Sequence, residues 1–449
     1  MASALSIVSN PIEAATIRKL RIRLLPFLFA LYVVAFIDRI NLSLAALTLN
    51  RELAITSQQF GLAAGIFFCG YFLFEVPSNL ILHKIGARVW MARILITWGT
   101  IATLSGFVQS VHQLYIARFA LGLAEAGYFP GIVLYLGYWF RQRHKAQAIA
   151  LILIGIPLAS ALGAPISGFI LDHVHWFGLS SWRWLLILEG LPAVTCAPLT
   201  YFLLPKRPAE AKFLTEEEKT WIADQLERED RQKLAAQSAS VARTLVNPRI
   251  WHLACIGFAS GFATYTFSFW LPQIMKSVLG SRSNTAIGFL VMIPNLLGLI
   301  AMILVSHHSD HTVERRCHMA TSLAVSGIAL LLLGAPRSPF LSVVLFSAVA
   351  IGAYSFLPVF FSVPSEFLSG FSAAAGIALV TSVANLGGFV GPYTVGIVRQ
   401  KTGNVYTGLI CAGVFFLIAA SLALALPRRA LPGPDQPSGA ADAACETAD

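Results

Sequence analysis

Two pairs of oppositely charged residues lie inside strongly apolar segments of this sequence. Asp38 and Arg39 are adjacent in the run 24–47, and Arg118 and Glu125 lie in the run 112–138. An ionisable side chain inside a membrane helix costs about 2.5–3.5 kcal/mol on insertion scales, and such residues usually face a cavity and perform a function. These four residues, called the charged quartet below, therefore predict a working site inside a membrane protein.

The chemistry open to the charged quartet follows from its residue types. A buried guanidinium keeps its charge, whereas a desolvated carboxylate can take up a proton. While Asp38 and Glu125 are ionised, they neutralise Arg39 and Arg118. Protonation of the acids frees both guanidiniums for an anion, and the planar guanidinium fork fits a carboxylate. We expect the acids to couple protons and the arginines to bind substrate. The alternative is that the charges only pair and tie two helices together.

The composition places these residues in a polytopic membrane protein. Of the 449 residues, 56% are hydrophobic and 12% are charged. A helix of roughly 20 apolar residues crosses a hydrocarbon core. Twelve such runs predict an all-α membrane protein, with twelve transmembrane helices in two pseudo-symmetric six-helix bundles. The runs are 24–47, 58–82, 89–109, 112–138, 146–172, 183–204, 250–275, 284–306, 318–336, 338–363, 371–398 and 405–426.

The distribution of basic residues predicts the topology. Four basic clusters fall on one side of the predicted membrane, as is typical of cytoplasmic loops. This bias accounts for the net charge of +10 without any binding of nucleic acid. We expect an inner (plasma) membrane protein with both termini in the cytoplasm and an uncleaved first helix, because the first run is too long for a signal peptide. The clusters are Arg18-Lys19-Arg21-Arg23, Lys84-Arg88-Arg93, Arg141-Arg143-Lys145 and Arg428-Arg429.

A polar segment separates the two predicted bundles. Thr215-Glu216-Glu217-Glu218 has the spacing of a capping box and predicts a surface helix from Leu214 to Arg231. Trp221, Ile222 and Leu226 would form its apolar stripe. The predicted domains are a cytoplasmic N-terminal tail (1–23), a first bundle (24–204), a cytoplasmic linker with the surface helix (205–249), a second bundle (250–426) and a disordered tail (427–449).

The two halves look like copies of each other. Gly163-Ala164-Pro165 in the fifth run has a counterpart in Gly391-Pro392 of the eleventh, and the polar loops after the second and eighth runs correspond at the same sequence separation. Repeats of six helices are typical of one large transporter fold. The candidate gate residues in these two loops are His83, Arg88, Asp310, Arg315 and Arg316.

Twelve helices, a central linker and two copies of a basic loop motif resemble the major facilitator superfamily. The chain is most similar to its anion:cation symporter branch, which includes permeases for tartrate, phthalate, hydroxyphenylacetate and galactonate and the sialin-type carriers. The resemblance implies that Asp38 and Glu125 carry protons, that Arg39 binds a substrate carboxylate, and that Tyr71 and Asn385 line the pocket. The motifs that carry it are Phe36-Ile37-Asp38-Arg39-Ile40-Asn41, Tyr71-Phe72-Leu73-Phe74-Glu75-Val76-Pro77-Ser78-Asn79, Arg118 with Glu125-Ala126-Gly127-Tyr128-Phe129-Pro130-Gly131, Phe269-Trp270-Leu271-Pro272 and Asn385-Leu386-Gly387-Gly388-Phe389-Val390-Gly391-Pro392. His83 departs from the family pattern, which usually has an acid there.

The predicted helices of the second half offer only neutral polar groups between their ends. Tyr265, Ser362 and Asn385 are the candidates for substrate contact there. Phe36 and Ile156 stand where sugar-acid members of the family often carry Tyr and Gln. A polyhydroxylated acid would leave hydroxyl groups unpaired at these positions, at roughly 1–3 kcal/mol each. We therefore expect a tartrate-like hydroxy acid or an aromatic acid such as hydroxyphenylacetate or phthalate.

Other titratable residues have simpler interpretations. Glu75 is expected to pack at the inner end of its helix, and Glu189 is expected to pair with Arg183 on the outer side. The six cysteines have no paired spacing, so the sequence predicts neither a disulfide nor a metal site, and no cofactor is expected. A histidine cluster is expected to be solvated in a loop. Its members are His307, His308, His311 and His318.

These observations favour a secondary active transporter that imports a small organic carboxylate together with protons and works as a monomer in the lipid bilayer. A facilitator or antiporter for the same acids is an alternative. A membrane sensor that kept the fold without transport is another, from a different class. The sequence contains no nucleotide-binding loop and no nucleophile elbow, so an enzyme is not expected.

Overall fold

The computed structural model describes residues 11–235, 246–280, 282–312, 314–334, 338–367 and 370–427. Every element in these ranges is a helix. Helices satisfy their own backbone N–H and C=O groups, which is what long apolar segments require in a bilayer. Nine helical segments in the described ranges are long and apolar enough to cross a membrane, and Arg316–Leu332 is a shorter apolar helix.

The N-terminal half contains eight α-helices and two short 3-10 turns. All six apolar runs predicted there coincide with one helix or with two consecutive helices. The elements are α1 (Pro11–Glu52), α2 (Ser57–Ile85), α3 (Ala87–Leu104), η1 (Ser105–Phe107), α4 (Val111–Glu125), α5 (Tyr128–Gly137), α6 (Gln142–Leu153), α7 (Gly155–His173), η2 (Trp176–Gly178) and α8 (Ser181–Leu203).

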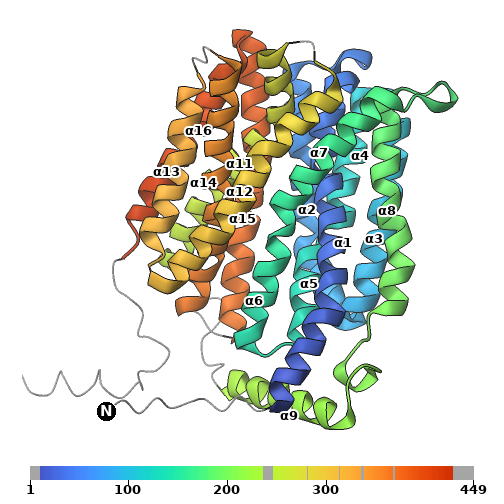
Figure 1. Ribbon diagram of the computed structural model, residues 1–449, viewed down its shortest axis with the longest axis vertical. Coiled ribbons are helices and arrows are strands. Elements are labelled where there is room, and N and C mark those ends of the chain that lie inside the picture. The colour runs from blue at the N-terminus through green and yellow to red at the C-terminus, as the bar shows by residue number, and fades with distance from the viewer. Residues whose placement is uncertain are drawn as a thin grey trace, which may run out of the picture.

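The C-terminal half repeats the arrangement with six long helices. Figure 1 shows this half, in yellow to red, beside the N-terminal half, in blue to green. The shorter elements η3 (Pro208–Glu210) and α9 (Glu216–Ala235) lie between the halves in sequence. The long helices are α11 (Pro248–Leu279), α12 (Asn284–Thr312), α13 (Arg316–Leu332), α14 (Pro339–Phe367), α15 (Gly370–Thr402) and α16 (Val405–Leu424).

α9 is the surface helix predicted from the capping box, and it lies across one end of the bundle (Figure 1). The Thr215 N–H donates to Glu218 Oε2 at 2.8 Å, and the Glu218 N–H donates to Thr215 Oγ1 at 3.3 Å. Ile222 of the predicted apolar stripe is fully buried. Lys19 of α1 pairs with Glu218 at 2.8 Å. We call this end of the molecule the α9 end and the opposite one the far end.

Two segments differ from the predicted boundaries. The first helix begins at Pro11 rather than near residue 24, because residues 11–23 continue α1 to the α9 end, where Lys19 finds its partner. The fourth run is split between α4 and α5, because Gly127 adopts a left-handed conformation with φ +87°. Residues 428–449 of the predicted tail 427–449 lie outside the described residues, and so do residues 1–10.

The two halves meet where α2 packs against α15 and α7 packs against α12. Glycine allows the backbones to approach: a Cβ at Gly61 would overlap the Pro392 carbonyl oxygen, and one at Gly288 would overlap the Ala164 carbonyl oxygen. The halves are thus in direct backbone contact along these helix pairs.

A polar contact reinforces this packing at the far end. Asp172, near the end of α7, faces the first residues of α12. Its Oδ1 accepts from the backbone N–H and the side-chain amide of Asn284 at 3.1 and 2.8 Å. Its Oδ2 accepts from the N–H and hydroxyl of Thr285, both at 2.7 Å. An anion at a helix N-terminus is further favoured by the helix dipole.

Candidate functional site

The break in the fourth membrane segment positions Glu125. α4 ends at this residue, and the Gly127 turn follows before α5 begins. Ser78 of α2 holds the turn by donating to the Ala126 carbonyl oxygen at 2.6 Å. Trp90 of α3 donates to the same hydroxyl at 2.9 Å. Helices interrupted at the depth of a site are tolerated where the break is buried in protein, and they are typical of transporter binding sites.

Asp38 lies on α1 in the interior of the N-terminal half and is 1% exposed. Its Oδ2 accepts from Trp98 Nε1 at 2.5 Å, and its Oδ1 accepts from Asn41 Nδ2 at 2.9 Å. The guanidinium of Arg118 lies within electrostatic range of this carboxyl group. Within the described part of the chain, Asp38 therefore has two neutral donors and one cation nearby, but no direct ion pair.

Arg39 and Glu125 form a direct ion pair between α1 and the end of α4. Glu125 shares its run with Arg118 and could have paired with it, but its direct contact is with Arg39. Arg118 instead donates from Nε to the Ala63 carbonyl oxygen of α2 at 3.4 Å. Within the described residues, Arg39 Nε, Arg118 Nη2 and Glu125 Oε2 are buried without hydrogen-bond partners. The charged quartet thus keeps binding capacity that the protein alone does not use.

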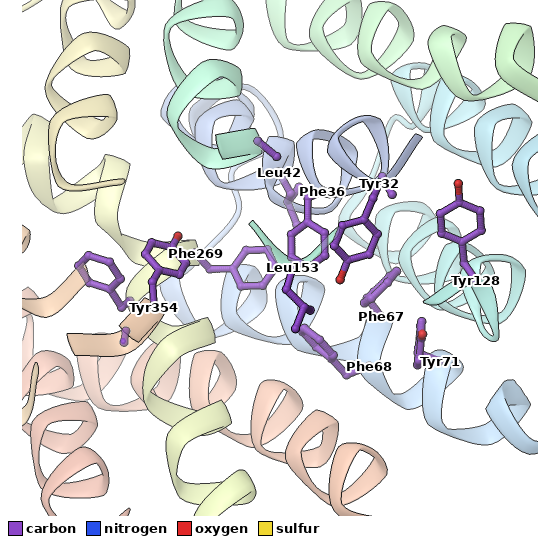
Figure 2. Close-up of a cluster of buried hydrophobic side chains, with 14 of the residues drawn as sticks. Tyr32, Phe36, Leu42, Phe67, Phe68, Tyr71, Tyr128, Leu153, Phe269 and Tyr354 are labelled. Atoms are coloured by element: carbon purple, nitrogen blue, oxygen red, sulfur yellow. The ribbon is translucent and has the colours of Figure 1, made fainter. Parts of the chain in front are cut away.

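Aromatic rings surround the Arg39 guanidinium. Its Cζ lies 4.8 Å from the ring centroid of Phe36, 5.3 Å from that of Phe67 and 5.5 Å from that of Tyr71. Figure 2 shows these rings together with Tyr32, whose centroid is 5.0 Å from that of Phe36. Such rings attract a cation through their faces and exclude water. An anion that reaches Arg39 would bind in a largely apolar surrounding.

The second half contributes to the same region through α11. The Tyr265 ring lies 4.4 Å from that of Phe68 on α2, and its hydroxyl interacts with Arg39. The other two candidates for substrate contact in the second half are Ser362 and Asn385. Ser362 of α14 donates to the Val359 carbonyl oxygen of its own helix at 2.8 Å, and Asn385 of α15 is half-buried. The substrate-binding roles of these residues stay predictions.

Two buried acids differ from their sequence interpretation. Glu75 does not simply pack at a helix end: it is 5% exposed and accepts from Ser382 of α15 at 3.0 Å, across the two halves. The predicted pair of Glu189 with Arg183 is wrong. Arg183 pairs with Glu52 at 3.4 Å, whereas Glu189 is buried and accepts from the Ser167 hydroxyl at 2.5 Å.

The loop residues divide between the halves. His83 is exposed, and Arg88 donates to the Leu204 carbonyl oxygen at 3.3 Å. Asp310 pairs with Arg315 at 2.6 Å, next to the half-buried Arg316. These contacts are within one half in each case, so the gate role stays a prediction.

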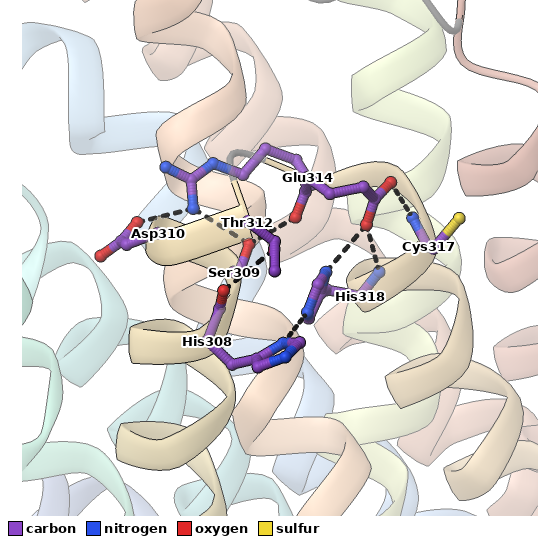
Figure 3. A network of polar contacts seen from close by, with 8 residues as sticks. His308, Ser309, Asp310, Thr312, Glu314, Cys317 and His318 are labelled. Carbon is purple, nitrogen blue, oxygen red and sulfur yellow. Dashed lines mark hydrogen bonds and ion pairs between the residues drawn. The ribbon is translucent and has the colours of Figure 1, made fainter.

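Two members of the histidine cluster, His308 and His318, belong to a polar network at the α12–α13 loop (Figure 3). His308 Nδ1 lies 2.7 Å from His318 Nε2, and His318 Nδ1 lies 2.8 Å from Glu314 Oε2. Burial raises the pKa of Glu314, but hydrogen bonds from Cys317 and His318 outweigh it and hold that pKa below its usual range. No group of three metal-ligating side chains is found within the described ranges.

Sequence reasoning missed several neighbours of the charged quartet. Phe67 lies one helical turn before Tyr71, and Tyr32 one turn before Phe36, so helical spacing was an available signal for both. Trp98, the donor to Asp38, and Ser167, the donor to Glu189, lie on other helices. Nothing in the sequence links them to these acids, because the contacts arise from helix packing.

Two helical bundles, the first with ionisable groups buried in its interior, are typical of a membrane transport protein. The chain belongs to the Major Facilitator Superfamily, whose family profile matches residues 28–392. It is not an enzyme. A relative from Agrobacterium vitis named "Putative tartrate transporter" is 42% identical over 422 residues, covering 94% of this chain and 93% of the relative. The inner membrane transport protein RhmT of Escherichia coli is 35% identical over 415 residues, covering 92% and 95%.

A solved structure supports the same fold. The inward-facing, occupied conformation of a bacterial homologue of the human lysosomal transporter Spinster matches with a TM-score of 0.72 at 16% identity, covering 90% of this chain and 96% of that one. At this level of identity the likeness concerns the fold alone. The chain is thus a multi-pass membrane transporter.

Proposed function

We propose that the protein is a proton-coupled symporter that takes up a small organic carboxylate across the inner membrane. The observation that carries this proposal is the buried ion pair of Arg39 with Glu125, set among polar atoms of the charged quartet that lack partners. If the ion pair served only to hold the helices together, we would expect the nearby guanidinium donors to be hydrogen-bonded within the protein. A carboxylate substrate would supply acceptors for Arg39 Nε and Arg118 Nη2.

In the proposed cycle, the ion pair between Arg39 and Glu125 opens: a proton replaces Arg39 at Glu125, and the substrate replaces Glu125 at Arg39. A proton binds a Glu125 oxygen, and the carboxyl group, now neutral, loses its attraction for Arg39. The substrate carboxylate then accepts hydrogen bonds from the Arg39 guanidinium, with Arg118 as the second cation. Rocking of one half against the other carries both to the opposite side. Asp38, which faces Arg118, takes up a proton in the same way.

For the substrate, we propose a tartrate-like hydroxy acid, with an aromatic acid such as hydroxyphenylacetate or phthalate as the alternative. The relatives named for tartrate support the first. The aromatic surroundings of Arg39 favour compact or apolar acids over polyhydroxylated ones, because they offer few partners for hydroxyl groups.

For the topology, we propose that the α9 end faces the cytoplasm and that the protein acts as a monomer. Basic side chains gather at that end, among them Lys19, Arg21 and Arg141, which agrees with the positive-inside rule. In this orientation the far end faces outward, and the loops around Arg88 and Arg315 lie at the inner opening.

Uptake by reconstituted proteoliposomes tests the proposal. Radiolabelled tartrate, hydroxyphenylacetate and phthalate are supplied with and without an imposed inward proton gradient. Symport predicts accumulation above equilibrium only with the gradient, together with co-transport of protons. Equilibration that ignores the gradient would instead identify a facilitator. Accumulation driven only by a preloaded counter-acid would identify an antiporter, and absence of flux for every acid would favour a sensor.

A further inference from the structure

Glu189 is one of four buried carboxyl groups in the N-terminal half, with Asp38, Glu75 and Glu125, and the proposed cycle does not use it. It lies on α8 and is 6% exposed. Its Oε1 accepts from the Ser167 hydroxyl of α7 at 2.5 Å, and its Oε2 is buried without a hydrogen-bond partner in the described part of the chain. One hydroxyl donor is little compensation for an ionised carboxylate in an apolar interior.

Among the residues that the structure describes, no cation is found to interact with Glu189. α8 packs against α1, α3 and α7. The titratable group that interacts with Glu189 from these helices is Asp38 of α1, which is also an acid. The other charged or titratable groups of α3, α7 and α8 that the structure describes have their contacts elsewhere: Arg88 with Leu204 and Tyr201, Arg93 with Trp90, Asp172 with α12, His173 with Phe169, Arg183 with Glu52 and Cys196 with Thr195.

Asn41 links the two acids. Its amide donates to Asp38 Oδ1 at 2.9 Å and also approaches the Glu189 carboxyl group. An amide nitrogen carries two hydrogens, so one Asn41 side chain can serve both acids. Asp38 has Trp98 and the field of Arg118 in addition, whereas Glu189 has only Ser167 and Asn41. Ionisation is thus less well supported at Glu189 than at Asp38.

The position of Glu189 along the membrane normal sets it apart from the charged quartet. It lies eight residues from the far-end start of α8, about 12 Å along the helix axis. Asp38 lies fourteen residues from the far-end terminus of α1, about 21 Å along that axis. Of the two acids, Glu189 is the nearer to the far end, which the proposed topology makes the outer side.

We propose that Glu189 is an additional proton-binding site of the transporter, coupled to Asp38 through Asn41, and that its proton is carried with the substrate. This inference rests on the proposed proton symport. Two adjacent acids with one cation near them cannot both ionise cheaply, so they titrate as a pair. Proton binding forms an O–H bond on a Glu189 oxygen, and release on the inner side restores the carboxylate.

The ratio of proton flux to substrate flux tests this inference. Proteoliposomes containing a pH-sensitive dye and labelled substrate give both fluxes for the wild type, Glu189→Gln, Ser167→Ala and Glu52→Gln. The Gln side chain keeps the size of Glu189 and can still accept from Ser167, but it binds no proton. We expect Glu189→Gln to lower the ratio by up to one proton per substrate, with substrate affinity within about twofold of the wild type.

Ser167→Ala provides a second variant in case Glu189→Gln does not fold. Loss of the hydroxyl donor disfavours the ionised form of Glu189, so the proton is retained through the cycle and the flux ratio falls as well. Glu52→Gln removes a more exposed acid from the same half and should leave the ratio unchanged. A wild-type ratio in both Glu189→Gln and Ser167→Ala overturns the inference. A wild type that moves no protons with its substrate overturns the proposed symport instead.

Discussion

Arg39 is the residue on which the proposed chemistry depends most directly. It combines an ion pair with Glu125, three aromatic neighbours and a buried Nε that has no hydrogen-bond partner among the described residues. Charge-assisted hydrogen bonds contribute about 1.5–3 kcal/mol each. A carboxylate that replaces Glu125 as the partner of Arg39 would gain energy of this size, which is enough to decide whether an acid binds.

Arg39→Ala should abolish detectable substrate binding. Loss of one charge-assisted hydrogen bond alone lowers the affinity roughly 10- to 150-fold, and the guanidinium can make more than one. Isothermal titration of the purified protein with the best-transported acid measures it. Arg39→Lys keeps the charge but loses the planar fork, so an intermediate affinity is expected. Unchanged affinity in Arg39→Ala, with a normal melting temperature, would contradict the assignment of Arg39.

Glu125→Gln should spare binding and uncouple uptake from the proton gradient. The amide oxygen can still accept from Arg39, but the side chain no longer binds a proton or carries a negative charge. We expect exchange of labelled for unlabelled substrate to continue at a rate near that of the wild type, while gradient-driven accumulation falls to the equilibrium level. Full accumulation in this variant would mean that Glu125 is a structural partner of Arg39.

At the scale of elements, the contact of α2 with α4 positions the aromatic residues Phe67 and Tyr71 beside Arg39. Gly122 lies against the backbone of Phe67 and Tyr71, and its added Cβ would overlap the Phe67 carbonyl oxygen. Backbone atoms cannot move aside as a flexible side chain can. The separation of α2 from α4 therefore sets how closely these rings approach Arg39.

Gly122→Ala should therefore destabilise the protein by about 1–3 kcal/mol, as overpacking usually does. It should also weaken substrate binding, because Phe67 and Tyr71 move away from Arg39. Thermal unfolding and titration measure the two effects. Gly137→Ala is the matched control, since its Cβ would meet only the end of the Lys145 side chain, at 3.1 Å. Equal stability of the two variants would show that the helices adjust freely.

At the scale of the whole molecule, α7 and α12 join the two halves at the far end. Asp172 accepts four hydrogen bonds from two residues of α12. Each is expected to contribute about 0.5–1.5 kcal/mol. Because α7 and α12 belong to different halves, opening of the far end must break them. They favour the far-end-closed state over any state in which these helices separate.

Asp172→Ala should shift the molecule at least about tenfold toward the far-end-open state, since its contacts exist only when that end is closed. Spin labels at the exposed positions His112 and Lys401 report the separation of the halves by double electron–electron resonance. A new population at longer distance is expected. Asp224→Ala removes an exposed acid of α9 and serves as the control. An unchanged distance distribution would contradict a role for Asp172 in closure.

The sequence by itself determined the fold class, the helix runs and the identity of the charged quartet. These features follow from local properties: an apolar run of membrane length forms a helix, and a charge inside it marks a buried polar site. The surface helix α9 was predicted for the same reason, because its capping box is local. The roles of Asp38, Arg39, Arg118 and Glu125 stay predictions that the experiments above test.

Only the tertiary structure decided which groups pair. The partner of Glu125 is Arg39 rather than Arg118, and Glu189 meets Ser167 instead of Arg183. Sequence distance favoured the neighbours on the same helix, but packing places side chains of different helices closer together. The break at Gly127 is a tertiary outcome too, since Ser78 of α2 holds the turn that ends α4 at Glu125. Pairing in a helical membrane protein is set by crossing helices, which the order of residues along one helix does not encode.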